Sequence, residues 1–133
     1  MGSMIFGMAM ALLGQALAQE KFDLVCSGNL KERPTQAKAL PAKTRFIVNL
    51  EDGLWCKSSE YGGLSDSCPL VSRIAEVTPD RLMFMKSDTG RTTLLMYVNR
   101  RDGSYSYFSL SPYHDENGQC EAAPFSGFPK AKF

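Results

Sequence analysis

The chain has 133 residues, of which 44% are hydrophobic and 22% are charged, and its 15 basic and 14 acidic residues give a formal net charge of +1 at pH 7. A chain of this length and composition is expected to fold as one domain around a single core. Nucleic acid is not an expected partner, because phosphate binding requires a clustered basic surface and the lysines and arginines form no such block.

The N-terminal segment has the pattern of a cleavable signal peptide. Residues 4–18 read MIFGMAMALLGQALA without a charge and end in Ala16-Leu17-Ala18. This stretch is shorter than the ~20 residues that cross a bilayer as a helix, and its small-residue end is typical of a cleavage site. We expect residues 1–18 to be removed, so that residues 19–133 form the mature domain in the periplasm or outside the cell without a stable membrane anchor. No Lys or Arg precedes the apolar stretch, which leaves a buried helix or an uncleaved anchor as the alternative.

The chain has four cysteines, Cys26, Cys56, Cys68 and Cys120, and an even number in an exported chain favours disulfides over free thiols. The glycine pair Gly62-Gly63 can turn the chain back between Cys56 and Cys68, which favours a local bridge there. Cys26 and Cys120 would then join the first strand to the last. A zinc site is the weaker alternative, because no Cys-x-x-Cys pair is present.

The first part of the mature chain has the pattern of short strands joined by turns. Alternating apolar and polar residues predict a half-buried strand over Phe22–Cys26. Residues 29–43 are polar and contain two prolines, which indicates an exposed loop or a short helical turn. A hairpin is predicted next, with strands at Phe46–Leu50 and Leu54–Cys56 and a turn at Asp52-Gly53.

Four further strands are predicted in the second half of the chain. Ile74–Val77 and Leu82–Met85 are separated by a type I turn signal and form a second hairpin. Thr92–Asn99 and Ser104–Leu110 form a third, and the change of parity at Tyr107-Phe108 indicates a bulge.

The C-terminal part is predicted to be less regular. Residues 111–118 are interpreted as a loop that leads into a short strand around Cys120. After about residue 123 the chain has too much proline and glycine for a ladder strand, and its phenylalanines are expected to cover an edge or a barrel mouth. The whole pattern predicts an all-β fold, an antiparallel meander of about 7–8 strands that forms a small barrel or a curved half-barrel stapled by two disulfides.

His114 is the single histidine of the chain and adjoins Asp115 and Glu116 in the predicted loop. It is the best general-base candidate, but a catalytic triad also requires a positioned nucleophile and an oxyanion hole, and no Gly-x-Ser-x-Gly signature is present. We therefore interpret His114 as a solvated loop side chain and predict no enzyme activity. The two acids lack the spacing of a calcium loop, and the sequence predicts neither a metal nor a cofactor.

Three tyrosines and two arginines are candidates for ligand binding. Tyr97, Tyr105 and Tyr107 can cluster across the third hairpin as an aromatic platform for a sugar or a peptide, although cross-strand packing explains them as well. Arg100 and Arg101 lie at the tip of that hairpin and could bind an anion, but exposed turn charges seldom contribute measurably.

Several short motifs follow one another along the mature chain. They are Phe-x-Leu-x-Cys-x-Gly at Phe22–Gly28, Gly-x-Trp-Cys at Gly53–Cys56, an approximate Asn-Arg-x-x-Gly-x-Tyr at Asn99–Tyr105, Gly-x-Cys at Gly118–Cys120 and Pro-Phe-x-Gly-Phe-Pro at Pro124–Pro129. This pattern resembles small exported alphaproteobacterial proteins of unknown function, and the resemblance implies export without implying an activity. A looser similarity is to the periplasmic lysozyme-inhibitor barrels, whose Ser-Gly-x-x-Tyr inhibitory loop is absent here.

The function that we expect from the sequence is that of an exported, non-enzymatic binding module, a monomer whose ligand is a protein or a cell-envelope glycan. Such a module needs only a pocket or a patch, which aromatic strands can supply. Two alternatives are a small periplasmic hydrolase that uses His114 and an envelope structural protein without a dedicated ligand.

Overall fold

The computed structural model describes residues 20–61, 64–66, 68, 70–87 and 93–129. The expected signal peptide, residues 1–18, and the glycine pair Gly62-Gly63 lie outside the described residues. Over the part of the chain that is described, the structure contains no helix that could cross a membrane.

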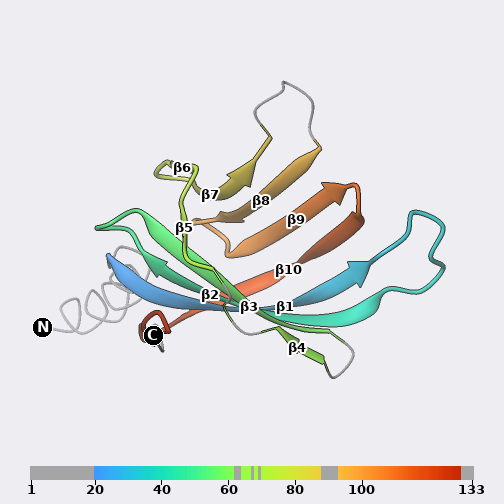
Figure 1. Ribbon diagram of the computed structural model, residues 1–133, viewed down its shortest axis with the longest axis horizontal. Helices are drawn as coiled ribbons and strands as arrows, with labels where there is room; N and C mark the ends of the chain where they lie inside the picture. Colours follow the sequence, from blue (N-terminus) through green and yellow to red (C-terminus); the bar gives the residue numbers. More distant parts are fainter. Residues whose placement is uncertain (1–19, 62–63, 67, 69, 88–92, 130–133) are drawn as a thin grey trace, which may run out of the picture.

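One antiparallel sheet contains all the described strands (Figure 1). The strands, in chain order, are β1 (Lys21–Lys31), β2 (Leu40–Asn49), β3 (Leu54–Tyr61), β4 (Leu64–Asp66), β5 (Ser72–Arg73), β6 (Glu76–Val77), β7 (Arg81–Lys86), β8 (Leu94–Asn99), β9 (Ser104–Leu110) and β10 (Tyr113–Ala123). Their order across the sheet is β4-β3-β2-β1-β10-β9-β8-β7-β6, and β5 pairs with β3 off this path. The all-β prediction is confirmed. The structure has two strands more than predicted, β4 and β5, each only two or three residues long, and the strand predicted at Ile74–Val77 is reduced to β6.

The sheet curls into a half-barrel, with β1 to β3 forming one wall and β7 to β9 the other (Figure 1). Two short consecutive strands tie the walls together. β5 pairs with β3 at Leu54 and Trp55, whereas β6 pairs with β7 at Leu82 and Met83. The segment from β5 to β6 therefore closes one end of the concave face.

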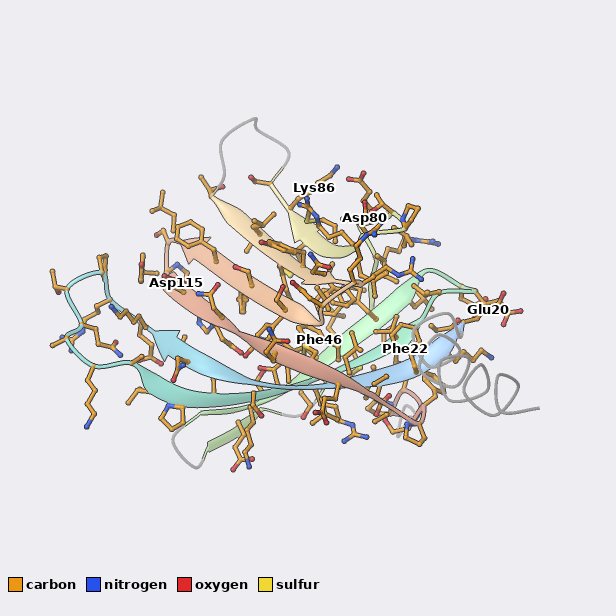
Figure 2. All side chains as sticks on the ribbon, turned by 180° about the vertical axis from the view of Figure 1, so that it is seen from behind. Glu20, Phe22, Phe46, Asp80, Lys86 and Asp115 are labelled. Carbon is orange, nitrogen blue, oxygen red and sulfur yellow. A yellow bond between two sulfur atoms is a disulfide. The ribbon has the colours of Figure 1, made fainter. Side chains whose placement is uncertain are left out.

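The hydrophobic core fills the concave face at this closed end. Phe46 of β2 stacks on Phe84 of β7 with ring centroids 4.6 Å apart, and Trp55 of β3 approaches Phe84 to 4.9 Å. Figure 2 shows Phe22 and Phe46 inside the molecule. The buried members of the cluster are Phe22, Leu24, Cys26, Phe46, Val48, Trp55, Leu82, Phe84, Met96, Val98 and Tyr105. Because these side chains come from both walls, burying them holds the sheet in its curled shape.

Both predicted disulfides are present. Cys26 and Cys120 are directly opposite each other in the β1–β10 ladder, so this bridge joins the first strand to the last at the middle of the sheet. The second bridge joins Cys56 of β3 to Cys68, twelve positions further along the chain. Two disulfides in a chain of this size indicate a non-reducing, extracellular type of environment.

Beside the first disulfide, two glycines face each other across β1 and β10. A Cβ atom added at Gly28 would lie 2.1 Å from the carbonyl oxygen of Asn117 and 2.7 Å from the Tyr105 hydroxyl, and one added at Gly118 would lie 2.0 Å from the Ser27 carbonyl oxygen. Only hydrogen atoms at these positions let the backbones approach so closely and leave space for the Tyr105 hydroxyl.

Replacing Gly118 by alanine is therefore expected to destabilise the fold by about 1–3 kcal/mol, the usual cost of forcing extra atoms into a packed site. Urea unfolding measures the loss. The exposed side chain of Ser27 on the partner strand provides a control, since Ser27→Ala adds no atoms and is expected to change stability by less than about 0.5 kcal/mol. Equal stability of the Gly118→Ala variant and the parent would contradict the close approach.

The structure lengthens the predicted strands at the expense of two predicted loops. The loop expected over residues 29–43 is reduced to residues 32–39, because β1 and β2 continue their ladder to the Leu30–Leu40 pair. The prediction of a loop over residues 111–118 is wrong, since β10 begins at Tyr113. Strand β10 lies between β1 and β9, so both of its edges are paired, and this backbone pairing holds the polar sequence in a strand.

The predicted bulge at Tyr107-Phe108 is also wrong. Both residues keep a regular register with β8 and β10. Phe108 instead points to the outer face of the sheet, where its ring meets Tyr113 edge to face at 5.9 Å. The irregularity in this part of the sheet lies in β7, between Met83 and Met85.

After β10 the chain continues as the irregular tail that the sequence predicts. The backbone N–H of Ser126 donates a hydrogen bond of 3.1 Å to Asp23 Oδ1, and Arg45 Nε lies 2.6 Å from Asp23 Oδ2. The Asp23 side chain is fully buried although it is on the outer face of β1. At this point the tail therefore contacts the outer face of the sheet.

Candidate functional site

The concave face changes from apolar to polar along its length. On β3, Trp55 belongs to the core, whereas Lys57 and Ser59 follow at the same parity toward the open end. On β2, Phe46 belongs to the core and Thr44 is opposite Ser59. Hydrophobic burial explains the closed end of the half-barrel. The polar side chains at the open end lie on the same concave face, and where they are buried they need hydrogen-bond partners, either one another or a ligand.

A buried carboxylate organises this polar end. Glu116 of β10 has no solvent-exposed surface. Its Oε2 accepts hydrogen bonds of 2.7 Å from Thr44 Oγ1 and 2.7 Å from the Tyr105 hydroxyl, and its Oε1 lies 2.9 Å from His114 Nε2. In this contact the donor and acceptor roles depend on which imidazole nitrogen carries the proton. Glu116 therefore fixes the orientation of His114.

Tyr107 is held between His114 and Lys57. Its ring centroid is 4.2 Å from that of His114, with the planes tilted by 32°, and Lys57 Nζ lies 4.8 Å from the same centroid. Lys57 is on β3 and Tyr107 on β9, so the contact joins the two walls of the half-barrel. The Tyr107 ring is therefore held by contacts from both walls.

The surroundings of Tyr107 disfavour ionisation of its phenol. Burial raises the pKa of Tyr107 above its usual value of 10.0, and the nearby Glu116 carboxylate raises it further. The neutral hydroxyl, which can both donate and accept a hydrogen bond, therefore persists to more alkaline pH than in an ordinary tyrosine.

The raised pKa of Tyr107 implies a loss of stability at alkaline pH. Because the unfolded phenol ionises near pH 10 and the folded one only at higher pH, the stabilisation is complete below the unfolded pKa and is lost as the pH rises through the folded pKa. We expect the free energy of unfolding of the parent to fall more steeply above about pH 10 than that of Tyr107→Phe, which has no proton to lose. Urea unfolding across this pH range tests the difference, and identical slopes would contradict it.

Beside this cluster lies an open cleft of about 410 Å³. It is lined by Glu32, Tyr107, Ser109, Pro112, Tyr113 and His114. His114 and Ser109 are directly opposite in the β9–β10 ladder, so their side chains share one face of the sheet. The His114 side chain is 17% exposed. His114 and Tyr107 thus form the boundary between the buried cluster and the cleft.

The interpretation of His114 as a solvated loop side chain is wrong. It lies on strand β10, and every second residue of a strand faces the same side, so His114 and Glu116 share the concave face. Asp115 between them faces the other side and accepts a hydrogen bond of 2.8 Å from Asn117 Nδ2.

The structure does not bring the three candidate tyrosines together. Tyr105 and Tyr107 face the concave side, where Tyr105 is buried against Glu116 and only Tyr107 reaches the cleft. Tyr97 pairs with Ser106 and Met83 at the opposite parity, on the outer face, where the Arg81 guanidinium lies 5.0 Å from its ring centroid. The prediction that three tyrosines form one aromatic platform is therefore wrong.

The two candidate arginines contact the turn between β6 and β7. Arg100 Nη1 donates a hydrogen bond of 2.9 Å to the Thr78 carbonyl oxygen, and Arg101 forms an exposed ion pair with Asp80. In Figure 2, Asp80 and Asp115 lie at different ends of the molecule. Arg100 and Arg101 do not line the cleft beside His114.

Sequence reasoning missed Thr44, Lys57, Ser109 and the role of Glu116. The available signal was the spacing of His114 and Glu116, which places two ionisable side chains on one face if the segment is a strand. Over the described ranges, no three His, Cys, Asp or Glu side chains are grouped as metal ligands would be.

Comparison with known proteins identified no related protein. No protein-family model matches the chain, and neither the curated proteins nor the solved structures contain a significant match. The resemblance to small exported alphaproteobacterial proteins therefore stays a prediction.

Proposed function

We propose that the protein is an exported binding module, without enzymatic activity, whose ligand occupies the cleft beside His114. The observation that carries the proposal is the rigid polar end of the concave face: Glu116 fixes His114, and His114 and Lys57 fix Tyr107. Side chains that are ordered before a ligand arrives lose little entropy on binding, which favours affinity. The cleft volume of about 410 Å³ is also within the usual range for small-molecule sites.

Export is part of the same proposal. The two disulfides support a non-reducing compartment, and the apolar N-terminal segment supports removal of residues 1–18 by a signal peptidase. The mature module would then meet its ligand in the periplasm or outside the cell.

The single histidine makes the proposal testable by NMR. Because the chain has one His, the imidazole C–H signals belong to His114 without further assignment. Neutral oligosaccharides, short peptides and inorganic phosphate are titrated separately into the oxidised protein. We expect one class to move the His114 signals saturably. If all three classes leave the signals unchanged at millimolar concentration, the proposal is wrong.

A hydrolase is the second candidate, and one observation favours it. Ser109 is opposite His114 in the ladder and Glu116 orients the imidazole, so the three residue types of a catalytic triad are neighbours, with the acid on Nε2 and not on the Nδ1 of the serine-protease arrangement. A serine-reactive fluorophosphonate separates the two functions. Labelling of Ser109 that is lost in His114→Ala would support a hydrolase, whereas an unlabelled, folded parent supports a binding module.

A further inference from the structure

The side chains that line the cleft favour one chemical class of ligand. This inference rests on the binding function proposed above. We propose that the cleft binds a neutral saccharide unit, with Tyr107 and Ser109 hydrogen-bonding to its hydroxyl groups. Anionic ligands, cationic ligands and protein partners each fit the observed side chains less well, for the reasons that follow.

An anionic ligand is disfavoured by the charges around the cleft. Glu32 lines it, and Glu116 lies directly behind His114. None of the six lining residues is Lys or Arg. An anion would therefore approach two carboxylates, whereas the nearby ammonium group of Lys57 contacts the Tyr107 ring and is not among the lining residues.

A cationic ligand is disfavoured by the geometry of the aromatic rings. Binding of an ammonium group to an aromatic site requires an accessible ring face. The Tyr107 ring already contacts the His114 imidazole and the Lys57 ammonium group, and that ammonium group repels a second cation. The Tyr113 ring is engaged edge to face with Phe108.

The groups that remain suit a ligand rich in hydroxyls. The hydroxyls of Tyr107 and Ser109 can each donate and accept a hydrogen bond, as saccharide hydroxyls do, and Glu32 adds an acceptor. A cleft of about 410 Å³ suits a few sugar rings, whereas a protein partner needs a far larger contact surface.

The experiment measures the affinity of the oxidised protein for neutral oligomers of glucose and of N-acetylglucosamine, with the His114 imidazole signals as the readout. Tyr107→Phe and Ser109→Ala each remove one hydroxyl from the cleft. Tyr97→Phe is the matched control, because it removes the same group from the outer face. We expect Tyr107→Phe to weaken binding about 10-fold, and Tyr97→Phe to leave it unchanged. Unchanged urea midpoints confirm that the variants are folded.

The outcomes separate this inference from the proposed function. If peptides or phosphate move the His114 signals and the oligosaccharides do not, the saccharide assignment is wrong while the binding function stands. If no class moves them, both are wrong. If Tyr97→Phe weakens saccharide binding as much as Tyr107→Phe does, the sugar binds elsewhere and the assignment of the cleft is overturned.

Discussion

Removing the disulfide between Cys26 and Cys120 is expected to lower the free energy of unfolding by about 4.7 kcal/mol, the value for a cross-link that closes a loop of nearly one hundred residues. The two cysteines are 94 positions apart and join adjacent central strands. Without the bridge, the unfolded chain gains the conformational freedom that the long loop had removed. The test is urea unfolding of the Cys26→Ala/Cys120→Ala variant.

The second bridge supplies the comparison for this prediction. Cys56 and Cys68 are separated by 12 positions, so their removal as Cys56→Ala/Cys68→Ala is expected to cost about 2 kcal/mol less than removal of the long-range bridge. Both pairs lose two sulfur atoms, and the two variants therefore differ chiefly in loop length. A larger loss for the short-range pair would contradict the assignment of Cys26–Cys120 as the main covalent constraint.

Replacing Glu116 by alanine is the second change with a large expected effect, a loss of about 3–5 kcal/mol. The substitution removes the acceptor that Thr44, Tyr105 and His114 share, and leaves their donors in a buried site. It also releases the orientation of His114, so the ligand affinity of the cleft should fall in any fraction that remains folded. Urea unfolding gives the stability, and the His114 NMR signals report the change at the cleft.

Two further variants make the Glu116 prediction specific. Glu121→Ala removes an exposed carboxylate from the same strand and is expected to change stability by less than about 0.5 kcal/mol. In a double-mutant cycle, Tyr105→Phe should cost much less in the Glu116→Ala background than in the parent, because the acceptor has already gone. Additive effects of the two substitutions would show that the hydrogen bond between them is unimportant.

Much of the fold can be predicted from the sequence because its apolar residues alternate where one side of a strand is buried. Phe22, Leu24 and Cys26 show this pattern, as do Phe46 and Val48, and these strands are found close to where they were expected. The pairing of the cysteines also followed from their positions, because the glycine pair between Cys56 and Cys68 favours a local bridge and leaves Cys26 to pair with Cys120.

The candidate site could not be predicted because its strand lacks that pattern. Residues 113–118 are mainly polar and resemble a loop, yet both edges of β10 are paired, with β1 and with β9. Glu116 can be buried only because Thr44 and Tyr105, which are distant in sequence, supply its hydrogen bonds. The contact between Lys57 and Tyr107 likewise depends on the curl of the sheet, which the local sequence does not encode.

Mass spectrometry of the unreduced protein, recovered from the exported fraction after expression of the full chain, tests the central claim most directly. That claim is that an oxidised half-barrel acts outside the cytoplasm. We expect a chain that begins at Gln19, has no cysteine that reacts with an alkylating agent, and yields peptides linked through Cys26–Cys120 and Cys56–Cys68. A chain that is retained inside the cell, begins at Met1 and carries four reactive thiols would contradict the account.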